Sequence, residues 1–186
     1  MKKLTDRQER RIMATVMKNI KMFGNGSSRV VVPFGKDKVV KIALCERGKN
    51  QNNNEIYLFE NHSNELNLAT IFAYSENIII MERLYDTFEY FENNEFSFIN
   101  SDSEFEYYYH EYGERVELQV DSIVEGLECH WGHTDDNWQL GVDKKGNIKS
   151  YDYGFDTNGT NQVGYLRSYN NKGIKQKVLN LKLSLW

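Results

Sequence analysis

Three strand-turn-strand patterns limit what this chain can fold into. In SRVVVPFGKDKVVKIAL, residues 28–44, two β-branched runs flank the turn residues GKDK. In TIFAYSENIIIMERL, residues 70–84, two strands meet at SEN, and in WQLGVDKKGNIKSYDYGF, residues 138–155, two alternating runs flank DKKGN. Pro33, the single proline, places its strand at a sheet edge or a strand end. The chain therefore contains antiparallel hairpins in its first half and again near residue 150.

Helical patterns lie between these hairpins. Residues 4–23 carry apolar residues at helical spacing, and Thr5 with Gln8 three positions later is an N-terminal capping signal. Residues 50–67 are a polar stretch followed by a helix that Glu55 opens, and residues 111–131 carry the apolar stripe of a further helix. This order of helices and hairpins predicts an α+β fold, and 186 residues suffice for one domain or for one domain with two small lobes.

The charge is uneven along the chain. The net charge of −4 argues against a general nucleic-acid binder. Residues 1–22 are basic, whereas residues 86–128 hold thirteen acids and one arginine. This pattern has two interpretations. The charged segments could form solvated faces whose opposite charges attract one another within the chain, or they could form a charged surface that binds a partner. The acidic and aromatic residues 86–112 are the candidate surface for a protein partner.

Neither cysteine content nor hydropathy indicates an export or membrane signal. Cys45 and Cys129 make no C-x-x-C pair and no disulfide framework, so we expect a reducing, cytoplasmic setting. No apolar run reaches the length of a membrane span, and the basic N-terminus lacks the uninterrupted apolar core of a signal peptide. We therefore expect no membrane association.

Three features in the first half could carry chemistry. GNGSSRVV, residues 24–31, has glycines that would let backbone amides approach phosphate oxygens, although two glycines before a strand are also typical of a simple turn. Lys41 lies inside the apolar run VVKIA, so it either has a buried partner or points to solvent. Glu55 could be that partner, or it could be an exposed acid in the first turn of a helix.

The last hairpin holds the candidate metal ligands. Asn137 and Asp152 lie at its two ends, so their oxygens could reach one Mg²⁺. Asp152, followed by tyrosine and glycine, could instead form a turn. A transition-metal site in CHWGHTDD is the competing interpretation. Its ligands would be Cys129, His130, His133 and Asp135.

In this order, the motifs resemble the protein-kinase-like fold, which includes protein kinases and the aminoglycoside and choline phosphotransferases. The resemblance rests on GNGSSRVV, on the lysine in VVKIA, on the glutamate in NEIYLF, on IIIMERL as the strand entering the hinge, and on DYG. It covers roughly residues 23–155. It implies a two-lobed α+β fold. Residues 1–84 would form an N-terminal helix and an antiparallel-sheet lobe that binds nucleotide, and residues 85–186 a reduced, mainly helical C-terminal lobe.

The resemblance also implies a role for each site residue, with ATP and Mg²⁺ as cofactors. Backbone amides would cover the phosphates at Gly24, Gly26 and Ser27. Lys41, held by Glu55, would contact the α- and β-phosphates, and Asn137 with Asp152 would hold Mg²⁺. Met81 would be the gatekeeper, and Glu82 and Leu84 would offer backbone groups to adenine.

Three departures from the family pattern bear on activity. Arg29 stands where the family has its third loop glycine. Gly132 stands where the catalytic aspartate belongs, and Asp135 and Asp136 are the substitutes within reach in sequence. About thirty residues follow DYGF, too few for the helices on which a protein substrate docks.

The sequence thus favours a pseudokinase that binds ATP and Mg²⁺ and acts through a protein partner. An active, small ATP-dependent phosphotransferase with an atypical catalytic loop is the alternative, because loss of a general base slows transfer without abolishing it. A structural protein with accidental motif matches is a third possibility. The composition, rich in Asn, Lys and Tyr and poor in Pro, is compatible with a phage protein.

Overall fold

The computed structural model describes residues 1–18, 24–25, 28–93, 95, 114–131 and 139–153. Its main sheet has six strands in the order β1-β5-β6-β4-β3-β2, antiparallel except for the β1–β5 pair. These are β1 (Lys2–Lys3), β2 (Gly24–Asn25), β3 (Arg29–Pro33), β4 (Lys38–Ala43), β5 (Ile71–Tyr74) and β6 (Ile78–Glu82). A second sheet pairs β7 (Gln139–Val142) with β8 (Ile148–Asp152). The helices are α1 (Asp6–Lys18), α2 (Glu46–His62), α3 (Thr87–Asn93) and α5 (Glu114–Trp131).

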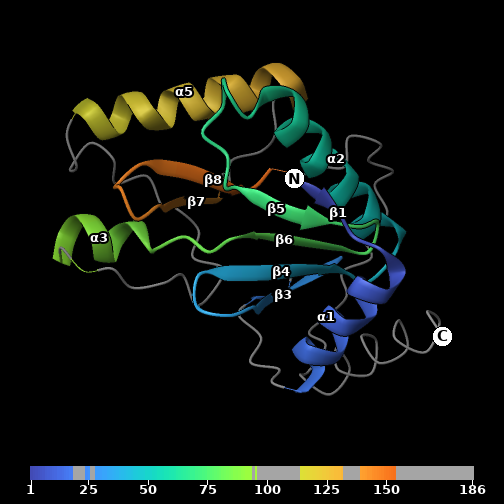
Figure 1. Cartoon of the computed structure of the whole chain (residues 1–186). Helices are drawn as coiled ribbons and strands as arrows, with labels where there is room; N and C mark the ends of the chain where they lie inside the picture. The colour runs from blue at the N-terminus through green and yellow to red at the C-terminus, as the bar shows by residue number, and fades with distance from the viewer. Residues whose placement is uncertain (19–23, 26–27, 94, 96–113, 132–138, 154–186) are drawn as a thin grey trace.

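The main sheet separates two hydrophobic clusters. Because side chains alternate along a strand, Val40 and Ile42 of β4 face α1, whose Met13 and Val16 join that cluster. Val39 faces the other way, into a cluster that includes residues of α2, α5 and the second sheet. Figure 1 shows α1 on one side of the sheet and α2 with α5 on the other. Lys41 has the same strand parity as Val39, so its side chain belongs to the face that α2 and β8 cover.

Backbone bonds fasten the second sheet to the first. Tyr85, just beyond β6, exchanges both of its hydrogen bonds with Val142 of β7, at 2.8 and 2.9 Å. The Ala69 amide donates to the Ser150 carbonyl at 2.8 Å, and the Ser150 amide donates to the Asn67 carbonyl at 2.9 Å. Both strands of the β7–β8 hairpin are therefore anchored, which fixes the position of its end at Asp152.

The predicted α+β class and all three hairpins are confirmed. The capping signal is also confirmed, because the Thr5 amide donates to Gln8 Oε1 at 3.0 Å and the Gln8 amide donates to Thr5 Oγ1 at 3.4 Å. The predicted start of the second helix is wrong: α2 begins at Glu46, so Glu55 lies in its middle. Strand β1 was not predicted. The division into two lobes at residue 84 stays a prediction.

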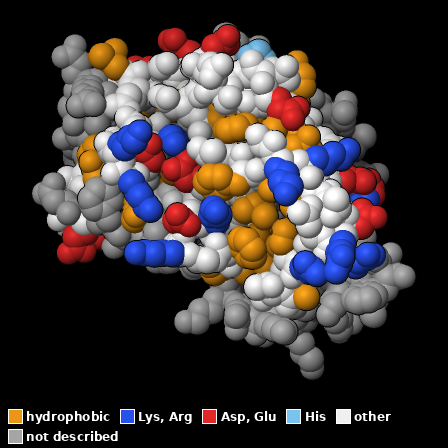
Figure 2. Space-filling view, in the orientation of Figure 1, with side chains coloured by type: hydrophobic (Ala, Val, Ile, Leu, Met, Phe, Trp, Pro, Cys, Tyr) orange, Lys and Arg blue, Asp and Glu red, His pale blue; other side chains and the backbone are white. Residues whose placement is uncertain are grey.

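One face of the molecule mixes hydrophobic and basic side chains. Figure 2 shows a hydrophobic strip in the middle of this face, with Lys and Arg side chains beside it. Among the exposed hydrophobic residues, Phe72 of β5 is 41% exposed, and the Lys38 ammonium lies 4.7 Å from its ring centroid.

Within the described ranges, no helix combines the length and apolar character that crossing a membrane requires.

Gly48 sets how closely α2 approaches the sheet. A Cβ atom there would lie 2.3 Å from the Ser28 carbonyl oxygen and 3.1 Å from the Ala43 Cα, both backbone atoms that cannot move aside by rotating a side chain. We predict that Gly48→Ala lowers the free energy of unfolding by about 1–3 kcal/mol in urea denaturation, because overpacking outweighs the gain in helix propensity. Asn53→Ala, on the exposed side of α2, is the control and should be neutral or stabilising. Equal effects of the two substitutions would contradict this packing.

Candidate functional site

Two buried cations come from adjacent strands of the main sheet. In the β3–β4 pair, Arg29 lies opposite Ala43 and Val31 lies opposite Lys41, so the two basic side chains are diagonal neighbours on one face. Arg29 is 5% exposed and Lys41 is 2% exposed. The alternative that Lys41 points to solvent is therefore wrong, and both charges require partners in the interior.

Helix α2 supplies the first partners. Gly48, Asn52 and Glu55 are spaced four and three residues apart, which places them along one helical face. Glu55 is 0% exposed, so it is no solvent-exposed helix acid. Its Oε1 accepts from the Lys41 ammonium at 2.7 Å and lies 3.0 Å from Arg29 Nη1. The predicted Lys41–Glu55 pair is thus confirmed.

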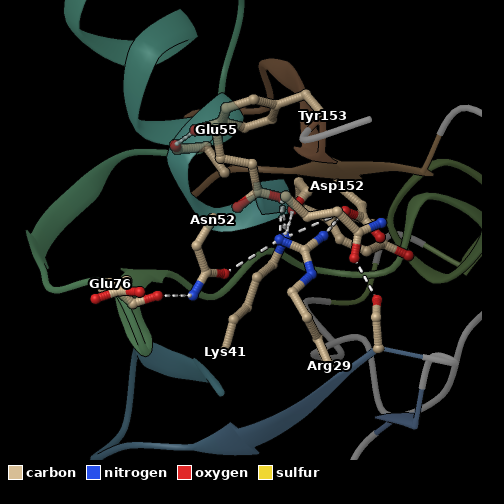
Figure 3. A network of polar contacts seen from close by, with 11 residues as sticks. Arg29, Lys41, Asn52, Glu55, Glu76, Asp152 and Tyr153 are labelled. Carbon is tan, nitrogen blue, oxygen red and sulfur yellow. Dashed lines mark hydrogen bonds and ion pairs between the residues drawn. The ribbon is translucent and has the colours of Figure 1, made fainter. Parts of the chain in front are cut away.

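Strand β8 brings the second carboxylate. The Lys41 ammonium lies 3.5 Å from Asp152 Oδ1 and donates to the Tyr151 carbonyl at 2.5 Å, and Arg29 Nη2 contacts Asp152 Oδ1 directly. Figure 3 shows these side chains pointing toward one another from β3, β4, α2 and β8. We call Arg29, Lys41, Glu55 and Asp152 the charge cluster.

The charge cluster balances two cations with two carboxylates. Burial raises the pKa of Glu55, although Arg29 and Lys41 oppose that shift. Burial acts in the same direction on Asp152, but there the neighbouring Arg29 and Lys41 prevail and hold its pKa below the ordinary range. The two carboxylates also differ in exposure, since the Asp152 side chain is 38% exposed and Glu55 is enclosed. Asp152 is therefore the open side of the cluster.

Several predicted site residues lie outside the described part of the chain. They are Gly26, Ser27, Gly132, His133, Asp135, Asp136 and Asn137. The side chains of Cys129 and His130, at the end of α5, are also outside it. Gly24 is described and pairs with Val31 across β2 and β3. The phosphate-covering loop, the catalytic-loop residues and the alternative transition-metal site therefore stay predictions.

The predicted hinge follows β6. Met81 is fully buried, and Glu82 donates its amide to the Thr70 carbonyl at 2.8 Å. The amides of Arg83 and Tyr85 also have backbone partners, whereas the Leu84 amide has none among the residues the structure describes.

The Leu84 side chain packs in the same hydrophobic cluster as Val39, Met81 and Leu140, on the sheet face of the charge cluster. Leu84 thus offers a backbone amide as a hydrogen-bond donor, and its side chain packs among apolar residues.

The described residues do not fit a divalent cation at Asp152. Mg²⁺ requires several oxygen ligands in near-octahedral geometry. Asp152 Oδ1 already contacts Arg29 and lies close to the Lys41 ammonium, and Glu55 Oε1 contacts the same two cations. Within the parts of the chain described here, no group of three or more His, Cys, Asp and Glu side chains could hold a metal ion. Asn137, the other predicted Mg²⁺ ligand, lies outside the described residues.

Sequence reasoning missed the role of Arg29 and Asn52. Arg29 stood out only as a replaced glycine, yet its Nη1 also donates to Asn52 Oδ1 at 3.4 Å, and Asn52 Nδ2 donates to the Glu76 carbonyl at 3.3 Å. A usable signal existed, because Arg29 opens a run of valines and shares strand parity with Val31. A charged residue at such a position predicts a buried partner in the same way that Lys41 does.

We predict that removing the Glu55 charge destabilises the fold. Glu55→Gln leaves Arg29 and Lys41 with one carboxylate between them, and breaking a buried ion pair costs about 3 kcal/mol or more. Glu46→Gln is the control on the same helix, because its pair with Lys49 is on the surface and is worth about 0–1 kcal/mol. Urea denaturation measures both values. A Glu55→Gln loss as small as that of the control would mean that Glu55 is not buried between the two cations.

Comparisons with known proteins identify no family for this chain. No family model and no curated protein matches it. A solved structure described as SAICAR synthetase (Type-2) in complex with ADP aligns with 71% of this chain and 79% of that chain, at 16% identity and a TM-score of 0.34. At that score the likeness supports no conclusion about fold or function, so the function has to be inferred from the charge cluster.

Proposed function

We propose that this chain is a kinase-like nucleotide-binding protein whose phosphate site is the charge cluster. The observation that carries the proposal is that Lys41 meets Glu55 of α2, 14 residues away, and the end of β8, 110 residues away, at one place. The kinase-like resemblance assigns phosphate contacts to this lysine, and it also expects the carboxylates of Glu55 and Asp152 beside it.

A purely structural role explains the charge cluster less well. Buried ion pairs are weak stabilisers, since apolar residues of similar volume often serve the fold as well or better. Two carboxylates with pKa values shifted in opposite directions, one of them at an open edge, are more typical of a functional site. An ammonium and a guanidinium side by side also suit the oxygens of a polyphosphate.

The hinge supports a nucleotide as the ligand class. The Leu84 amide, which has no partner among described residues, could donate to a ring nitrogen of a base. Val39, Met81 and Leu140 provide apolar surface in the same cluster. A planar base between such side chains, with its phosphates toward Lys41, would use both features at once.

In finer detail, we propose that the protein is a pseudokinase that acts through a protein partner in the cytoplasm. Gly132 at the expected position of the catalytic aspartate supports loss of phosphotransfer, since glycine has no group to accept a proton. The acidic and aromatic residues 86–112 are the proposed partner surface. An active phosphotransferase would need Asp135 or Asp136 at the reaction centre.

Thermal unfolding with ATP tests the proposal. At ATP about 100-fold above its Kd, we expect the wild type to gain about 5 °C or more in Tm, because a ligand of the native state stabilises it. Lys41→Met should lose this gain, measured against its own Tm without ATP, whereas Lys49→Met, which removes a surface pair with Glu46 and Glu76, should keep it. An unchanged gain in Lys41→Met would refute the assigned phosphate site. ATP turnover that Asp152→Ala abolishes would favour the active enzyme over the pseudokinase.

A further inference from the structure

The charge cluster holds a cation where the kinase-like pattern expects a metal ion. Arg29 Nη2 contacts a carboxylate oxygen of Asp152, the residue that the kinase-like resemblance assigns to Mg²⁺. We propose that Arg29 takes the place of the divalent cation, so that the cluster binds the phosphates of a nucleotide without metal. This inference rests on the nucleotide-binding function proposed above and adds how the phosphate charge is neutralised.

The Arg29 guanidinium is fixed from several sides. Nη1 lies 3.0 Å from Glu55 Oε1 and donates to Asn52 Oδ1 at 3.4 Å, and Nη2 contacts Asp152. Asn52 is itself held by the Glu76 carbonyl, on the turn between β5 and β6 (Figure 3). Withdrawing Arg29 from Asp152 would break contacts with α2 and β8 together, so residues of both elements hold the guanidinium in the site.

The position of Arg29 disfavours the binding of a metal ion at Asp152 and favours the binding of an anion. A divalent ion on Asp152 would stand beside the two buried cations Arg29 and Lys41, whose like charge would repel it. The guanidinium has five N–H groups, and the three contacts with Glu55, Asn52 and Asp152 leave two of them for further acceptors. Its planar donors match phosphate oxygens, and Lys41 adds a second positive charge 3.5 Å from Asp152.

Calorimetric titration of the full chain with ATP, in EDTA and in Mg²⁺, tests this inference. For the wild type we expect the two Kd values to agree within about threefold, which is under 1 kcal/mol. In Arg29→Gln, we expect the Kd in EDTA to rise at least about tenfold, and Mg²⁺ to recover part of the loss because Asp152 is now free to bind it. Arg7→Gln, an exposed residue of α1, is the control and should behave like the wild type.

The wild-type titrations decide the inference even if Arg29→Gln fails to fold. ATP binding that appears only with Mg²⁺ would overturn metal-free binding and leave the proposed function standing. Absence of ATP binding in both buffers would overturn the proposed function, and this inference with it. In a folded Arg29→Gln variant, a Kd in EDTA equal to that of the wild type would show that Arg29 does not replace the metal.

Discussion

The burial of two cations and two carboxylates in one place is the constraint on which the rest of the structure depends. Charged groups leave water only when they are paired, so Arg29, Lys41, Glu55 and Asp152 must converge. They come from adjacent strands, from a helix and from the end of a second sheet. The cluster therefore ties the order of the sheet to the position of α2 and to the anchoring of the β7–β8 hairpin.

Two local features allow this convergence. Gly48 gives α2 the room to lie against the Ser28 carbonyl, which brings the next turns of the same helical face toward the sheet. The backbone bonds of Ser150 with Asn67 and Ala69 fix β8 two residues before Asp152. Tyr153, fully buried with its hydroxyl donating to the Ala69 carbonyl at 3.1 Å, holds the chain on the other side of Asp152.

The sequence predicted what local pattern can encode. The hairpins followed from β-branched runs around turn residues, and the Lys41–Glu55 pair followed from a lysine in an apolar strand together with the kinase-like resemblance. The start of α2 was missed because its asparagine-rich turns have low helix propensity, which the packing of Gly48 and Asn52 against the sheet overrides. The strand parity of Arg29 with Val31 indicates a buried partner for Arg29, but that partner, Asp152, is 123 residues away, and a single sequence does not reveal which residue it is.

A double-mutant cycle between Arg29 and Asp152 tests the convergence most directly. Arg29→Met, Asp152→Asn and the double variant are unfolded in urea, and the coupling energy is the part of the double effect that the single effects do not explain. Contact between the two side chains predicts a favourable coupling of at least about 1 kcal/mol. Additive effects within error would mean that the two residues do not meet, which would contradict the charge cluster and the function built on it.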